Sequence, residues 1–265
     1  MPLSFDGQRI LILGAGVTGN AVARSLTKRG AVVSIADENP AAKSEHTVLT
    51  AKEVVIKGFD SVVVSPGWRQ DHPLVDAAVG AGLSLLNEVD LAWQIKSELA
   101  PAQKWLALTG TNGKTTTVEM VAAMLKRGGL KATACGNVGE TVIEVVDRAD
   151  AYEVLVLELS SFQLHWSKQA QFVASAILNI ADDHIDWHGS FDEYAKAKIS
   201  ILDRATTAVL NADDGEIVKR TSHWQGRKVF YSLDTPAPGE IGLVEELLVD
   251  RAFVQDPQEA SMFAE

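Results

Sequence analysis

The chain has 265 residues, 46% of them hydrophobic and 22% charged, so it can bury a substantial core and is not intrinsically disordered. Its formal net charge of -11 disfavours non-specific binding to nucleic acid or to an anionic membrane. The one cysteine, Cys135, excludes a disulfide framework within the chain and a zinc site built from several cysteines. The N-terminal sequence MPLSFDGQRI lacks the features of a signal peptide, and the apolar runs are shorter than a membrane span, so we expect a cytoplasmic protein.

The first part of the chain alternates short runs rich in Val, Ile and Leu with segments of helical period. Strands are predicted over residues 9–13, 31–36 and 61–64. Helices are predicted over residues 17–29, 73–80 and 88–98. This alternation predicts parallel strands joined by crossover helices, an α/β domain of the Rossmann type.

The pattern breaks around Pro101, where a proline among small residues suits a linker. It then starts again, with strands predicted over residues 104–109, 154–159, 173–178 and 207–210 and helices over residues 114–127 and 191–202. Ser190 is the expected N-cap of the last helix, with Glu193 as its capping-box acid. A short strand pair is expected within residues 243–253. We therefore predict two α/β domains, residues 1–98 and residues 99–265.

Between the first predicted strand and helix lies a glycine-rich loop, Gly14-Ala15-Gly16-Val17-Thr18-Gly19. Its glycines permit close approach of a diphosphate, which the N-terminus of the helix attracts. Asp37 ends the next strand and could accept hydrogen bonds from a ribose or a uracil. Ser65, Pro66 and Gly67 follow another strand and would lie at the same sheet edge, unless they form an ordinary turn. A loop without a ligand, or NAD binding by a dehydrogenase, would also fit this pattern.

The second predicted domain begins with another glycine-rich loop between a strand and a helix, Gly110-Thr111-Asn112-Gly113-Lys114-Thr115-Thr116. In a P-loop, backbone amides hold phosphates, the lysine reaches the β- and γ-phosphates, and the following hydroxyl binds Mg²⁺. The general pattern has a glycine where Leu108 stands, so the match is partial. Because a dehydrogenase needs no ATP site, the two loops together favour an ATP-dependent enzyme.

Three further side chains could serve a phosphate site, each with a plainer alternative. Glu158 ends a predicted strand and offers oxygen ligands for Mg²⁺, although a solvated or ion-paired carboxylate would look the same. His184 lies in an acid-rich loop and could be a metal ligand or a structural histidine. Lys198 is by itself a surface lysine on an amphipathic helix, because an ammonium group has no lone pair for a metal. We assign no role to the neighbouring side chains His165, Trp166, Trp187, His188 and Lys196.

The string T-G-T-N-G-K-T-T-T at residues 109–117 resembles the ATP loop of the Mur ligase family, ATP-dependent amide ligases that include folylpolyglutamate synthases. The shortened glycine spacing is typical of that family. The segments C-G-N-V-G, L-N-I-A-D-D-H-I-D and Y-A-K-A-K, which begin at residues 135, 178 and 194, also fit. The segment E-L-S-S-F-Q-L at residues 158–164 is the most specific, because it resembles the branch that adds D-glutamate. The resemblance extends from the first strand to about Phe253.

The resemblance implies an ATP-dependent ligation of D-glutamate to UDP-N-acetylmuramoyl-L-alanine through an acyl phosphate, a step of peptidoglycan precursor synthesis. It implies that the first glycine loop, Asp37 and residues 65–67 hold the UDP part. It also implies that Asn137, Ser160 and Gln163 position the muramoyl-alanyl part.

The same resemblance implies a catalytic set of Lys114, His184 and Lys198. Lys114 would stabilise the transferring phosphoryl group. One Mg²⁺ would bind Thr115 and Glu158. A second would bind His184 and Lys198, with Lys198 carbamylated by CO₂ so that it becomes an anionic oxygen ligand.

Family members continue with the rest of the ATPase domain and a third domain that recruits the incoming amino acid. We therefore expect this chain to be a monomer that binds the UDP substrate and makes little product alone, with the D-glutamate site in a domain absent here. Three alternatives stay open: another Mur ligase, an NAD-dependent oxidoreductase, and a nucleotide-binding module without catalysis.

Overall fold

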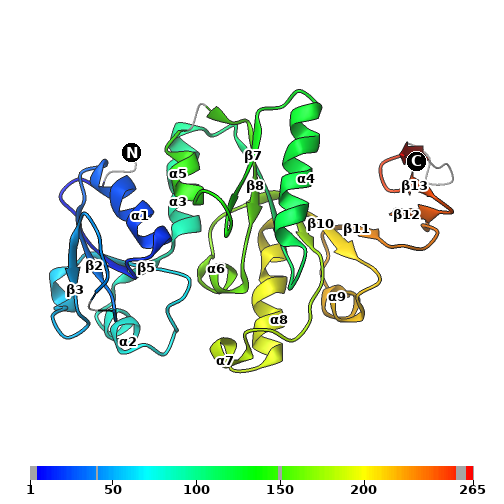
Figure 1. The fold of residues 1–265 in the computed structure, drawn as a ribbon. Helices are drawn as coiled ribbons and strands as arrows, with labels where there is room; N and C mark the ends of the chain where they lie inside the picture. Colours follow the sequence, from blue (N-terminus) through cyan, green and yellow to red (C-terminus); the bar gives the residue numbers. More distant parts are fainter. Residues whose placement is uncertain (1–4, 40, 149–150, 255–260, 265) are drawn as a thin grey trace.

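The computed structural model describes residues 5–39, 41–148, 151–254 and 261–264, and it confirms a mixed α/β protein with parallel sheets (Figure 1). It contains two separate sheets. In Figure 1 the first sheet lies on the left and the second occupies the centre and the right. Within the described segments, no helix combines the length and the apolar character that crossing a bilayer requires.

The first sheet has five parallel strands in the order β3-β2-β1-β4-β5. They are β1 (Arg9–Leu13), β2 (Val32–Ala36), β3 (Thr47–Leu49), β4 (Ser61–Val64) and β5 (Ser84–Leu86). The connections contain α1 (Val17–Thr27), the 3₁₀ helix η1 (Ile56–Gly58) and α2 (Pro73–Gly80). This strand order follows the Rossmann pattern, which brings the carboxyl ends of β1 and β4 side by side.

The predicted bounds are confirmed for β1, β4 and α2. Helix α1 ends at Thr27, two residues before the predicted end at residue 29. The chain reverses at Gly30, whose φ of +85° lies in the left-handed region, and Ala31 N donates to Leu26 O at 3.1 Å. Strands β3 and β5 were not predicted because three residues are too few to show a period.

The second sheet has nine strands in the order β14-β13-β12-β11-β10-β9-β6-β8-β7. They are β6 (Lys104–Thr109), β7 (Ala132–Gly136), β8 (Val154–Glu158), β9 (Phe172–Ile177), β10 (Ala205–Asn211), β11 (Arg227–Tyr231), β12 (Glu240–Val244), β13 (Leu247–Asp250) and β14 (Ser261–Ala264). Strands β6 to β12 pair in parallel, whereas β13 pairs antiparallel with β12 and β14. The strand pair expected within residues 243–253 is thus confirmed as the hairpin β12–β13, which starts slightly earlier.

Six helices of the described chain accompany this sheet. They are α4 (Lys114–Arg127), α5 (Val142–Val146), α6 (Ser161–Trp166), α7 (Ile185–His188), α8 (Phe191–Ile199) and α9 (Gly215–Thr221). Ser190 caps α8 as predicted, because its hydroxyl accepts from Glu193 N at 3.1 Å. The helix predicted to reach residue 202 ends at Ile199, and the chain continues as the 3₁₀ helix η3 (Ser200–Arg204).

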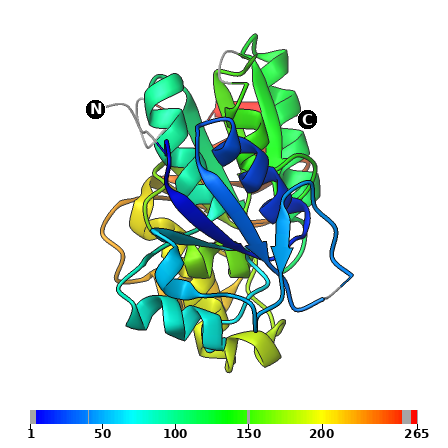
Figure 2. The same cartoon turned by 90° about the vertical axis from the view of Figure 1, so that its left-hand side faces the viewer.

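Helix α3 (Glu88–Leu99) joins the two sheets and packs against α1 and α5. Its buried Glu88 accepts a hydrogen bond from Ile143 N at 2.7 Å, at the start of α5, and burial raises the pKa of Glu88 to about 7. One apolar core runs from Ile10 in β1 to Leu155 in β8. Figure 2, in which the first sheet faces the viewer, shows the second sheet and its helices directly behind it.

Candidate active site

The first glycine loop lies at the carboxyl end of β1, as predicted. Gly14 has φ +104°, and a Cβ added there would lie 2.9 Å from Nε1 of Trp68, so the turn requires glycine. At Gly19, an added Cβ would collide with the carbonyl oxygen of Gly14. Gly16 is the N-cap of α1 and has no side chain to satisfy the first amides of the helix, so they remain available to an anionic ligand.

The neighbouring residues of the first domain meet at the same sheet edge. Asp37 Oδ2 accepts from Ala15 N at 2.6 Å, and Oδ1 accepts from Asn39 N at 2.8 Å, so this carboxylate fixes the glycine loop. Ser65 N donates to Leu13 O at 3.0 Å, which ties the end of β4 to the end of β1. Ser65 Oγ is buried and has no hydrogen-bond partner among the described residues. An unpaired buried hydroxyl is unfavourable, so this oxygen favours a ligand that bonds to it.

A cavity of about 590 Å³ lies between the two domains. From the first domain it is lined by Gly14, Gly16, Val17, Thr18, Gly19, Asp37, Ser65, Pro66, Gly67 and Trp68. From the second domain it is lined by Gly136, Asn137, Gly139, Thr141, Ser160, Phe162 and Gln163. The structure thus brings the predicted substrate-binding residues together, except Ala15, which does not line the cavity. The aromatic residues Trp68 and Phe162 were missed, because no motif distinguishes such a ring from a core residue.

Ser160 and Gln163 begin α6 with a reciprocal capping box. Ser160 Oγ accepts from Gln163 N at 3.2 Å, while Gln163 Oε1 accepts from Ser160 N at 2.9 Å and from Ser160 Oγ at 3.1 Å. The side-chain carbonyl oxygen of Gln163 is therefore engaged in the capping box. The amide NH₂ of Gln163 is the group left for a ligand in the cavity.

The P-loop follows β6 and leads into α4, as predicted. Gly113, with φ +80°, is the N-cap of α4, and Lys114 Nζ donates to the carbonyl oxygens of Gly110 and Thr111 at 2.9 Å each. Asn179, on the segment after β9, holds the loop from the other side, since its Oδ1 accepts from Asn112 N at 2.8 Å. The sequence showed Asn179 within the L-N-I segment without indicating this contact.

A second cavity, of about 420 Å³, lies over the P-loop and is lined by Thr111, Asn112, Gly113, Lys114, Thr115, Thr116, Asn137, Val138 and Glu158. Glu158, at the end of β8, is only 2% exposed. Its Oε2 accepts from Thr115 Oγ1 at 2.9 Å, and its Oε1 accepts from Asn137 Nδ2 at 3.0 Å. The predicted pair Thr115 and Glu158 is therefore in direct contact.

The surface position that the helix pattern alone suggests for Lys198 is wrong, whereas the role that the resemblance implies for it remains a prediction. Its side chain is 2% exposed, and Nζ donates to Gly110 O at 2.7 Å and lies 4.8 Å from the ring centre of Tyr194. Burial, followed by the nearby charge of Lys114, lowers the pKa of Lys198 to about 7. The helix pattern could not reveal this, because the burial results from the P-loop packing over α8.

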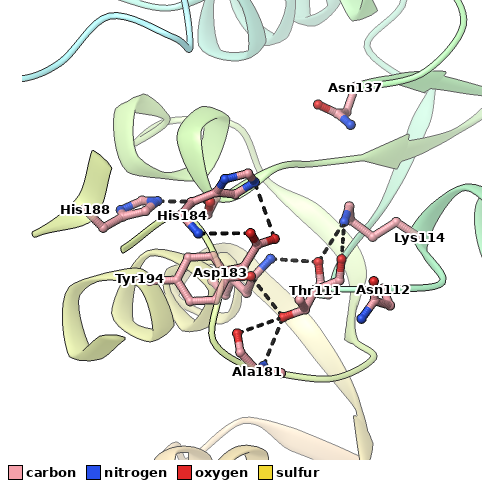
Figure 3. A network of polar contacts seen from close by, with 12 residues as sticks. Thr111, Asn112, Lys114, Asn137, Ala181, Asp183, His184, His188 and Tyr194 are labelled. Atoms are coloured by element: carbon pink, nitrogen blue, oxygen red, sulfur yellow. Dashed lines mark hydrogen bonds and ion pairs between the residues drawn. The ribbon is translucent and has the colours of Figure 1, made fainter. Parts of the chain in front are cut away.

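His184 lies close by but is not joined to Lys198. It begins α7 in the left-handed conformation, with φ 49°, and its Nε2 is 3.4 Å from Asp183 Oδ2 (Figure 3). Its ring lies 4.7 Å from that of Phe162. Across the described part of the chain, no three His, Cys, Asp or Glu side chains are grouped to hold a metal. The predicted ligand pair of His184 and Lys198 includes a lysine, which lies outside this statement, so the pair remains a prediction.

The aromatic neighbours differ in their roles. His188, to which the sequence assigned no role, is buried, its Nε2 lies 3.0 Å from Ser161 Oγ, and burial lowers its pKa to about 4. Trp166 and Trp187, to which the sequence assigned no role, donate hydrogen bonds to the loop after Ser65. Trp166 Nε1 donates to Trp68 O at 3.2 Å, and Trp187 Nε1 donates to Gly67 O at 3.1 Å.

Two protein families match the chain along most of its length. Residues 8–87 match the Mur ligase MurD-like, N-terminal domain, and residues 108–258 match the Mur ligase middle domain. Similar curated proteins are the UDP-N-acetylmuramoylalanine--D-glutamate ligases of Thermobifida fusca, 44% identical over 97% of this chain, and of Corynebacterium efficiens, 41% identical over 96%. The chain spans 58% and 55% of the lengths of these two relatives.

Solved structures of the same fold have lower sequence identity. The UDP-N-acetylmuramate:L-alanyl-gamma-D-glutamyl-meso-diaminopimelate ligase of Neisseria meningitides is 15% identical, with a TM-score of 0.58 over 93% of this chain and 85% of its own. The UDP-N-acetylmuramate-alanine ligase of Thermotoga maritima is 22% identical, with a TM-score of 0.51 over 88% of this chain and 54% of its own. At these identities the likeness shows the fold alone.

Proposed function

This chain belongs to the Mur ligase family, and on that premise we propose that it carries the UDP-substrate site and the ATP site of a UDP-N-acetylmuramoyl-L-alanine:D-glutamate ligase. The observation that carries this proposal is the position of Asn137, which lines both the inter-domain cavity and the P-loop cavity. A substrate carboxylate in the first cavity would therefore adjoin a γ-phosphate in the second. The names of the curated relatives support D-glutamate as the incoming amino acid.

The UDP part of the substrate belongs in the first domain. Its diphosphate would lie against the amides at the start of α1, where glycines allow close approach. Ser65 Oγ, beside Gly14, supports this assignment because it is buried and has no hydrogen-bond partner in the described part of the chain. The muramoyl-alanyl part would extend towards Asn137 and the side-chain NH₂ group of Gln163, on the second domain.

ATP and one Mg²⁺ belong in the P-loop cavity. The buried carboxylate of Glu158 fits a hard divalent cation, because its oxygens accept hydrogen bonds only from the neutral donors Thr115 and Asn137 among the described residues. Bound there, Mg²⁺ would neutralise charge on the phosphates. Lys114, from the start of α4, would stabilise the negative charge that develops on the γ-phosphoryl group.

Lys198 fits the second metal site only after modification. As an ammonium group it has no lone pair, but its pKa of about 7 leaves much of it as a neutral amine near neutral pH. A neutral Nζ can attack the carbon of CO₂ and release a proton, which forms an anionic carbamate. That group, together with the imidazole of His184, would supply ligands for a second Mg²⁺.

The reaction then follows in two steps. A carboxylate oxygen of the substrate attacks the γ-phosphorus, the bond to the bridging oxygen breaks, and ADP leaves. The amine of D-glutamate attacks the acyl carbon, inorganic phosphate leaves, and the amine loses a proton. Since the reaction consumes ATP and a UDP-linked precursor, we also propose a cytoplasmic location.

Calorimetric titration tests the proposal. The chain should bind UDP-N-acetylmuramoyl-L-alanine saturably and should not bind NADH. Lys114→Met should weaken the binding of Mg-ATP at least tenfold, because it removes a direct phosphate contact, whereas Lys126→Met at the other end of α4 should not. Binding of NADH alone would establish the oxidoreductase alternative instead. Equal or tighter binding of UDP-N-acetylmuramate or of a longer UDP-muramoyl peptide would indicate another Mur ligase.

A further inference from the structure

The width of the inter-domain cavity depends on contacts between the two domains. Its walls come from the loop 65–68 in the first domain and from Asn137, Phe162 and Gln163 in the second. The affinity of a ligand that touches both walls therefore depends on how the two domains are placed relative to each other. The contacts that join the two walls directly are therefore the ones through which a ligand bound in this cavity can affect the rest of the protein.

Three hydrogen bonds join the second domain to consecutive residues of one first-domain loop. Trp187 Nε1 donates to Gly67 O at 3.1 Å and Trp166 Nε1 donates to Trp68 O at 3.2 Å. The next residue, Arg69, donates from Nη1 to Asp186 O at 2.7 Å. Gly67 and Trp68 line the cavity, so these bonds act on its wall. The ion pair between Arg24 and Glu144 also joins the domains, but it lies near the end of α1 that is farther from the glycine loop.

Trp187 connects this wall with His184, whose ring centre lies 6.5 Å from that of Tyr194. The hydroxyl of Tyr194 in turn lies 2.9 Å from Oγ1 of Thr111 in the P-loop. Trp187 lies in the single turn of α7, which His184 begins, and Trp187 N donates to His184 O at 3.1 Å. The Trp187 ring lies 4.9 Å from Phe162, and Phe162 in turn lies 4.7 Å from His184. Phe162 also lines the cavity. Trp187 therefore contacts both a backbone group and a ring that a ligand in the cavity would touch.

We propose that Trp187 is a positioning residue that couples occupancy of the inter-domain cavity to the placement of His184 beside the P-loop. This inference rests on the proposed function, because it takes the cavity as the UDP-substrate site and the P-loop as the ATP site. The hydrogen bond to Gly67 O holds α7 to the substrate wall. A ligand that fixes this wall also fixes His184, so each ligand favours the arrangement that the other requires.

The test is the coupling between the two ligands. The affinity for UDP-N-acetylmuramoyl-L-alanine is measured by calorimetry with and without a non-hydrolysable Mg-ATP analogue, and the ratio is the coupling factor. One net hydrogen bond corresponds to a factor of about three to ten, which we expect for the wild type. Trp187→Phe keeps a ring and removes the N–H, so its factor should fall close to one. Trp224→Phe is the matched control, because it removes a bond of the same kind, 3.2 Å from Nε1 to Leu202 O, outside the lining of both cavities.

A second measurement uses the unmodified chain. Its six tryptophans give six indole N–H signals in a ¹⁵N spectrum, which single Trp→Phe variants assign. The Trp187 signal should shift on addition of either ligand, and the Trp224 signal should not. An unchanged coupling factor in Trp187→Phe, a wild-type factor of one, or a static Trp187 signal would overturn the inference. Failure of the wild type to bind the UDP compound would instead overturn the proposed function, and the inference with it.

Discussion

Replacing Asp90 by Asn should destabilise the protein strongly, although it changes one atom. Asp90 lies on α3 and is 3% exposed. Its Oδ1 accepts from Ser167 Oγ at 2.8 Å and from the amides of Gln169 and Ala170 at 2.9 and 3.0 Å. Its Oδ2 accepts from Lys168 N at 2.6 Å and from an Asn87 side-chain N–H at 2.8 Å. One carboxylate thus holds the segment that leaves α6 against the helix that joins the domains.

The size of the expected loss in stability follows from the number of hydrogen-bond donors that contact the Asp90 carboxylate. In the Asn variant, one oxygen can still accept from three donors, but an NH₂ group replaces the oxygen that faces Lys168 N and Asn87. The variant loses two hydrogen bonds to a charged group, and each contributes about 1.5–3 kcal/mol to stability. In addition, the buried Arg204, which donates to Ser167 Oγ, loses the negative charge beside it. We therefore expect a loss of roughly 3–6 kcal/mol in the free energy of unfolding.

Urea unfolding followed by circular dichroism measures this loss at pH 7.5. Asp192→Asn is the control, because Asp192 is exposed and pairs only with Arg220 among the described residues, and it should leave the unfolding midpoint almost unchanged. Burial by itself would raise the pKa of Asp90, but the amides of Lys168, Ala170 and Gln169 together lower it below its ordinary value. The stability that Asp90 contributes is therefore present above its unfolded pKa and is lost as the pH falls through the folded value. A loss of less than about 1 kcal/mol in Asp90→Asn would refute this reasoning.

Two further predictions concern buried titratable groups. Burial raises the pKa of Glu88 from 4.5 to about 7, so the stability that this group contributes is complete below pH 4.5 and is lost as the pH rises through 7. Relative to Glu88→Gln, the free energy of unfolding of the wild type should therefore fall by about 3 kcal/mol across that range. The same pH dependence of stability in the two proteins would contradict this. In ¹³C-bicarbonate at pH 7.5, the wild type should show a carbamate signal by ¹³C NMR that Lys198→Met abolishes. The exposed Lys196 on the same helix is the matched control, and a signal lost in Lys196→Met but kept in Lys198→Met would contradict the assignment.

The sequence was sufficient where structure is determined locally. Both phosphate loops, their strands and their helices were predictable, because glycine spacing and apolar period report directly on a strand, a tight turn and a helix start. The pairing of Thr115 with Glu158 came from the family resemblance, and the structure places the two side chains in contact because β6 and β8 are neighbouring parallel strands. The assignment of individual residues to ligands, and the division into two domains after residue 98, remain predictions.

The sequence was insufficient where structure depends on packing between distant segments. Lys198 has the pattern of a surface lysine, and its burial appears only once the P-loop lies over α8. In the sequence, Trp166 and Trp187 resemble core residues. The structure shows that their indole N–H groups donate to a loop that lies 98 and 120 positions earlier in the chain, respectively. Glu88 and Asp90 resemble the acidic first turn of a helix, whereas most of their hydrogen-bond partners belong to the second domain.

The connection between the two cavities rests on the alignment of two strand ends. Strands β7 and β8 pair in parallel with Gly136 opposite Glu158, so Asn137 leaves the sheet next to the carboxylate that would bind Mg²⁺. Gly136 has φ +115°, and a Cβ added there would lie 2.5 Å from Glu158 O. Any side chain at this position would therefore separate the two strand ends and move Asn137 away from Glu158. The same glycine keeps the amide of Asn137 at the border of both cavities, which is the geometry that the proposed phosphoryl transfer from ATP to a carboxylate in the neighbouring cavity would require.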